Sequence, residues 1–118
     1  MKNLLSKTIT ILSLLFTATF VNAQVNLTIT NPSGVCSPTT VDITANSITS
    51  GSSGGGVLSY WTDSSCNKQL DLPTAISSSG VYYIKSVNGS FSDVKPVVVV
   101  INNRPSITNP GNQTVCDT

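Results

Sequence analysis

The stretch GVYYIKSVNGSFSDVKPVVVVI, residues 80–101, decides the fold. Before the Asn88-Gly89 pair, Tyr82 and Ile84 would share one face of a strand, opposite Tyr83 and Lys85. Asn-Gly is a strong signal for a two-residue hairpin, so the run after it should pair antiparallel with the run before it. Pro96 lies inside the second run and places the first half of that run on a sheet edge or at a bulge.

The end of this stretch, residues 97–101, is apolar on both faces and would form an aggregation-prone edge if it were left bare. We therefore predict that both faces are at least partly covered. The core would take either Val98 and Val100 or Val97 and Ile101.

Upstream, residues 25–30 and residues 40–45 also alternate between apolar and polar side chains, and each is predicted to be a strand. Residues 57–62 are a third candidate strand. Residues 70–76, which contain a proline, indicate a short irregular edge. The Ser/Gly run at 50–56 has no side chains that could order its backbone, so we expect a mobile loop there.

No stretch of ten residues after the first 23 shows helical periodicity. About seven short strands with regularly spaced turn signals predict an all-β sandwich. A small closed barrel is the alternative.

The N-terminus has the features of an export signal. Lys2 and Lys7 precede the apolar residues 9–21, a stretch that is short for a membrane span. Small residues at the −3 and −1 positions place a cleavage site after Ala23. Residues 1–23 are therefore predicted to be a signal peptide of a secreted or cell-surface protein, with an uncleaved membrane anchor as the alternative.

The charge balance argues against nucleic acid as a partner. The whole chain has six Lys and Arg residues and five Asp residues, a net charge of +1, and loss of Lys2 and Lys7 with the signal leaves −1. No basic stripe is present to neutralise phosphates. After signal cleavage no membrane span is expected.

A repeat marks the domain organisation. Ile-Thr-Asn-Pro followed by Val-Cys occurs in residues 29–36 and again in residues 107–116, 78 positions later with two residues inserted. That period is too long for a solenoid repeat and fits one β-sandwich per unit. We assign one domain to residues 24–103, and a linker with the truncated start of a second, similar domain to residues 104–118.

Three motifs resemble the immunoglobulin-like modules that are repeated in large surface and adhesin-like proteins of Bacteroidetes. They are Tyr-Trp-Thr-Asp at 60–63, Gly-Val-Tyr-Tyr-Ile at 80–84 and Ser-Asp-Val-Lys-Pro-Val at 92–97. The resemblance implies an immunoglobulin-like β-sandwich of about seven antiparallel strands. Such modules often accompany gliding-motility-associated regions and sorting by the type IX secretion pathway. This chain has Phe91 where they often carry a cysteine.

The same residues predict a structural core. Gly80-x-Tyr82-x-Ile84 has the spacing of a tyrosine corner, in which the phenol hydrogen-bonds to backbone a few residues upstream. Ile84 would point inward. Trp61 would be the core tryptophan that packs near it.

The three cysteines follow the predicted signal, in a compartment where disulfides persist. Cys36 precedes the second predicted strand and Cys66 follows the third, so both can lie at one end of a sandwich. We predict a Cys36–Cys66 disulfide and an unpaired Cys116. The alternative is three free thiols.

Catalytic chemistry has little support. The chain has neither His nor Glu, so the hydroxyl groups lack the commonest base. Asp63 and Asp71 could form a glycosidase-type pair, but both lie in turn sequence, where Asp usually binds backbone. A calcium site from these two and Asp93 lacks the usual loop pattern. We predict no enzyme, no cofactor and no metal site.

Two functions remain open. The first is a non-catalytic structural or adhesive module that acts as spacer or interaction domain between neighbouring immunoglobulin-like domains and contacts surface glycans or proteins. The second is a carbohydrate-binding module attached to a downstream hydrolase. Tyr60-Trp61 and Tyr82-Tyr83 must each turn one ring outward if they lie on strands, and such rings could stack on sugars.

Overall fold

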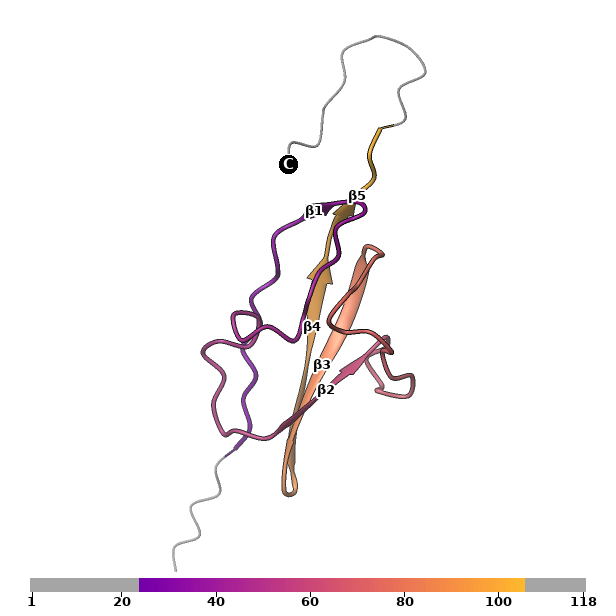
Figure 1. Ribbon diagram of the computed structural model, residues 1–118. Coiled ribbons are helices and arrows are strands. Elements are labelled where there is room, and N and C mark those ends of the chain that lie inside the picture. Colours follow the sequence, from indigo (N-terminus) through magenta and orange to yellow (C-terminus); the bar gives the residue numbers. More distant parts are fainter. Residues whose placement is uncertain (1–23, 106–118) are drawn as a thin grey trace, which may run out of the picture.

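The computed structural model describes residues 24–105, which form an all-β chain without a helix (Figure 1). Five strands follow in order: β1 (Val35–Cys36), β2 (Val57–Trp61), β3 (Gly80–Asn88), β4 (Phe91–Val99) and β5 (Ile101–Asn102). The predicted signal peptide and residues 106–118 of the predicted second unit lie outside the described residues.

Strands β2, β3 and β4 form one antiparallel sheet with β3 in the centre. The predicted antiparallel hairpin is confirmed, but its turn lies one residue later than the Asn88-Gly89 pair: Asn88 pairs with Phe91, and Gly89 and Ser90 form the two-residue turn. Gly89 has φ +58°, a conformation that glycine adopts without strain. Pro96 lies in β4 at the sheet edge, as its missing N–H requires.

One face of this sheet, which we call the inner face, carries the core. Ile84 on β3 and Val97 on β4 are fully buried, and Val99 is almost so. Ile101 packs against this cluster, so the second of the two predicted arrangements for residues 97–101 is confirmed. Each fully buried aliphatic side chain contributes about 1.5–3 kcal/mol relative to exposure.

Three irregular segments, residues 24–31, 39–53 and 69–79, pack on the inner face, and together we call them the covering layer. They supply the buried side chains of Val25, Leu27, Val41, Ile43, Ile48 and Ile76. The alternation predicted for residues 25–30 and 40–45 is thus correct in which side chains it buries. The backbones, however, make only isolated bridges, Asn26 with Ser53 and Val41 with Ile76.

A local hydrogen bond explains why residues 40–45 do not continue as a strand. Oδ1 of Asp42 accepts bonds from the backbone N–H of Thr44 at 2.7 Å and from its hydroxyl at 2.6 Å. Such a side-chain bond competes with ladder pairing and starts a turn. The chain from Ile43 to Ser50 accordingly follows a series of turns. Because neither this segment nor residues 25–30 joins a ladder, residues 24–105 contain five strands, and the predicted sandwich of about seven is not confirmed.

Strand β1 was not predicted. It pairs parallel with β5, in the register Val35 to Ile101 and Cys36 to Asn102, and the two form a separate two-stranded sheet. The prediction of purely antiparallel strands is therefore wrong at this edge. Two residues are too few to give a periodic sequence signal.

The Ser/Gly loop at 50–56 is tied to its surroundings. Asn26 and Ser53 exchange two backbone hydrogen bonds of 3.0 and 2.9 Å. Nδ2 of Asn88 donates to the Gly54 carbonyl oxygen at 2.7 Å. Gly56 has φ +120°, and a Cβ on it would collide with the Ser86 hydroxyl, so glycine allows the loop to approach β3 closely. These contacts give the loop a defined path that its composition did not predict.

Candidate functional site

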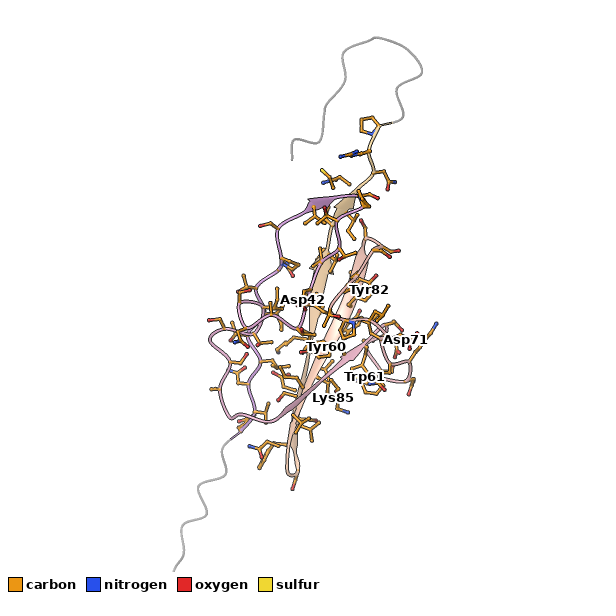
Figure 2. All side chains as sticks on the ribbon, in the orientation of Figure 1. Asp42, Tyr60, Trp61, Asp71, Tyr82 and Lys85 are labelled. Atoms are coloured by element: carbon orange, nitrogen blue, oxygen red, sulfur yellow. The ribbon has the colours of Figure 1, made fainter. Side chains whose placement is uncertain are left out.

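The two neighbouring aromatic residues of β2 face opposite sides of the sheet (Figure 2). Tyr60 packs against the core, whereas Trp61 lies on the other side, which we call the outer face. The indole Nε1 of Trp61 donates to Oγ of Ser59, two residues back on the same face, at 2.9 Å. The prediction of a core Trp61 is wrong. Leu58 packs against the core, and because side chains alternate along a strand, Tyr60 shares its face and Trp61 lies on the opposite one.

Burial raises the pKa of the Tyr60 hydroxyl, and the negative charge of Asp42 adds to the increase. The Thr44 hydroxyl and amide that bind Asp42 hold the pKa of that carboxyl below its usual range. Asp42 therefore stays ionised and the Tyr60 phenol stays protonated near neutral pH. Neither group exchanges a proton there.

The outer face is rich in aromatic and apolar groups. Trp61 lies directly opposite Tyr83, and Tyr83 lies directly opposite Pro96, so one row crosses all three strands. Lys85, two residues after Tyr83, shares this face and is half-buried. Cross-strand neighbours at this spacing lie close enough to contact a single ligand ring.

Next to this row the surface is aliphatic. Val81 and Val98 are register partners, and they are 48% and 41% exposed. Val100 continues the same side and is 45% exposed. Both faces of residues 97–101 were expected to be at least partly covered, and on this face Val98 and Val100 are only partly covered within residues 24–105. A patch of this kind on a sheet marks a candidate contact surface.

Tyr82 and Ile84 occupy the positions that the sequence predicted. The Tyr82 hydroxyl donates to the Ser78 carbonyl oxygen, four residues upstream, at 2.9 Å. This is the bond expected of a tyrosine corner, and it joins β3 to the covering layer. Ile84 is 0% exposed and lies at the centre of the core cluster.

The predicted Cys36–Cys66 disulfide is wrong. Cys66 carries a free thiol, whereas Cys36 is disulfide-bonded. Cys36 lies on β1 against β5, and Cys66 lies in the turn after β2, so the two cysteines belong to different strand ends. Cys116, predicted to be unpaired, lies outside the described residues.

The three aspartates considered as calcium ligands do not share a site within residues 24–105. The carboxylate of Asp63 accepts backbone bonds from Lys68 at 2.8 Å and Asn67 at 3.2 Å, which lower its pKa. Asp93 binds the Leu27 amide and forms an ion pair with Lys95. Asp71 is exposed. Among residues 24–105 no group of three or more potential metal ligands is assembled.

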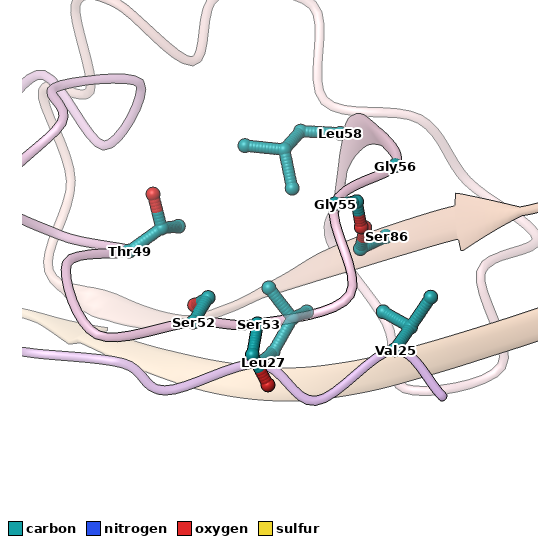
Figure 3. A pocket seen from close by; sticks show the side chains of 9 residues that line it. All are labelled: Val25, Leu27, Thr49, Ser52, Ser53, Gly55, Gly56, Leu58 and Ser86. Atoms are coloured by element: carbon teal, nitrogen blue, oxygen red, sulfur yellow. The ribbon is translucent and has the colours of Figure 1, made fainter. Parts of the chain in front are cut away.

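A small hollow of about 160 Å³ opens where the covering layer meets β2 and β3 (Figure 3). Val25 and Leu27 form one wall, and Leu58 lies across from them. The Ser86 hydroxyl on its wall donates to the Gly55 carbonyl oxygen at 3.1 Å. Its other polar lining consists of hydroxyls without a neighbouring base, so the hollow can hold a small apolar group but offers no acid–base chemistry.

Comparisons of the chain with protein families, with curated proteins and with solved structures give no match. None of the residues between 24 and 105 belongs to a helix long and apolar enough to cross a membrane.

Proposed function

We propose that this chain is a secreted or cell-surface spacer module, one immunoglobulin-like β-sandwich in a row of similar domains. The observation that carries the proposal is the position of the two ends. Residue 24 leaves the module at one pole and residue 105 leaves at the opposite pole (Figure 1). Modules with ends at opposite poles can be joined into an extended row, in which each adds its full length.

Three features support the immunoglobulin-like architecture. The first is the tyrosine corner at Tyr82. The second is a core between two layers, with the sheet β2–β3–β4 on one side and the covering layer on the other. The third is the antiparallel Val41–Ile76 bridge, which joins the strand predicted at residues 40–45 to the irregular edge predicted at residues 70–76. Export through a cleaved signal, and sorting by the type IX pathway, remain part of the proposal.

The spacer function is tested with two copies of residues 24–105 joined in tandem. Small-angle X-ray scattering should give a maximum dimension close to twice that of one copy. Two copies that fold back on each other, with a maximum dimension near that of a single copy, would contradict it. N-terminal sequencing of the exported chain should begin at Gln24.

A carbohydrate-binding module is the second candidate, and the Trp61–Tyr83 pair on the outer face favours it. Sugar rings stack on aromatic side chains, and Lys85 is placed to bind hydroxyl or carboxylate groups beside them. A glycan array should then show binding that Trp61→Ala abolishes. Phe91→Ala, which removes a 37%-exposed ring at the hairpin end, is the control. If the array shows no binding, the spacer function is the one candidate that remains.

A further inference from the structure

Two segments of the module run side by side in the same direction: residues 24–37, which include β1, and residues 91–102, which include β4 and β5. At one end, backbone hydrogen bonds join them. The Val35 amide donates to the Val100 carbonyl oxygen at 3.1 Å, and the Ser37 amide donates to the Asn102 carbonyl oxygen at 2.9 Å. This is the short parallel ladder of β1 and β5.

Side chains continue the contact where the ladder stops. Oδ1 of Asn31 accepts a bond from the Val98 amide at 2.9 Å. Farther down, Oδ2 of Asp93 accepts a bond from the Leu27 amide at 2.8 Å. The partners in these two bonds are 67 and 66 residues apart, close to the register separation in the ladder, which pairs Val35 with Ile101. All four bonds therefore belong to one parallel alignment, which we call the clamp.

The direction of the clamp decides how it responds to tension. Both segments run from the pole where residue 24 lies to the pole where residue 105 lies (Figure 1). Tension between the two ends pulls residues 24–37 one way and residues 91–102 the other way, along their common axis. The four bonds lie across this axis, so they are loaded together instead of breaking one after another.

We propose that this clamp is a load-bearing device, through which the module resists tension between its two neighbours. The inference rests on the proposed spacer function, because only a module linked at both ends experiences such tension. Asn31 and Asp93 are its key side chains, since they extend a two-residue ladder over the length of β4.

The test is the lifetime of the full chain held at constant force by its two termini in an optical trap. Reductant is present, so that the disulfide at Cys36 does not carry the load. Asn31→Ala should raise the unfolding rate about fivefold, the factor for one hydrogen bond of ordinary strength. Asn88→Ala is the matched control, because it also removes one Asn bond to backbone, at 2.7 Å, but away from the clamp.

A second pair of variants keeps the test independent of Asn31. Asp93→Ala removes the acceptor for the Leu27 amide and should shorten the lifetime, whereas Asp93→Asn keeps an acceptor oxygen and should preserve it. Equal lifetimes for the Asn31 and Asn88 variants, or for the two Asp93 variants, would overturn the clamp. Failure of the spacer function would appear separately, as compact tandem copies in scattering.

Discussion

The sheet β2–β3–β4 and the covering layer build the same core with different backbones. Ile84, on the central strand, and Ile43, in a segment without ladder pairing, are both 0% exposed. In the sheet, regular pairing places the side chains. In the covering layer, side-chain acceptors and isolated bridges do so, as at Asp42 and Val41. Burial of an apolar side chain therefore does not require a continuous strand.

The largest expected effect tests whether the two layers are energetically equal. Ile84→Ala and Ile43→Ala should each lower the free energy of unfolding by about 2–5 kcal/mol, because each leaves a cavity in a close-packed core. Urea unfolding measures both. Val57→Ala, at a 75%-exposed position, should change stability by less than about 0.5 kcal/mol. A loss below about 1 kcal/mol for Ile43→Ala alone would show a loosely packed covering layer.

The next effect concerns the bond that joins the layers. Tyr82→Phe removes the hydroxyl that donates to the Ser78 carbonyl oxygen, and it should cost about 1 kcal/mol. Tyr83→Phe makes the same chemical change on the outer face and should cost clearly less. Thermal unfolding of the two variants compares them directly. Equal losses would remove the special role of Tyr82.

A smaller effect, with the opposite sign, is expected in the turn between β2 and the covering layer. Cys66 has φ +54°, where a side chain costs about 1–2 kcal/mol and glycine pays only its greater freedom in the unfolded chain, about 0.5–1 kcal/mol. Cys66→Gly should therefore stabilise the module by about 0.5 kcal/mol. Cys66→Ala keeps a Cβ and should give no such gain. Both are measured by urea unfolding, and a destabilised Cys66→Gly would contradict the reasoning.

The smallest effect is the pH dependence of the same turn. The amides of Lys68 and Asn67 lower the pKa of Asp63, so folding favours the ionised carboxylate. Its contribution is complete above the pKa of the unfolded chain, about 3.9, and is lost as pH falls through the lower folded value. Asp63→Asn should remove this part of the acid sensitivity. NMR titration of the carboxyl carbon should give a value below that of an unfolded peptide.

Sequence patterns predicted the parts of the fold that depend on local chemistry. Asn88-Gly89 predicted the hairpin, and alternation predicted the burial of Leu27, Val41 and Ile84. Patterns failed at Trp61. Of two adjacent aromatic residues on a strand, either one can face the core, and only packing decides which. They also failed at Cys66, because a disulfide requires proximity that spacing along the chain does not report.

By itself the sequence determined the all-β class, the antiparallel hairpin, the tyrosine corner and the identity of most core side chains, since each follows from interactions between near neighbours in the chain. Only the tertiary structure decided that the covering layer lacks ladders and that β1 runs parallel to β5. It also decided that Asn31 bonds to Val98 of β4, 67 residues away, and that Asp93 bonds to Leu27, 66 residues away. Such long-range contacts depend on how the layers pack, and no local pattern encodes that packing.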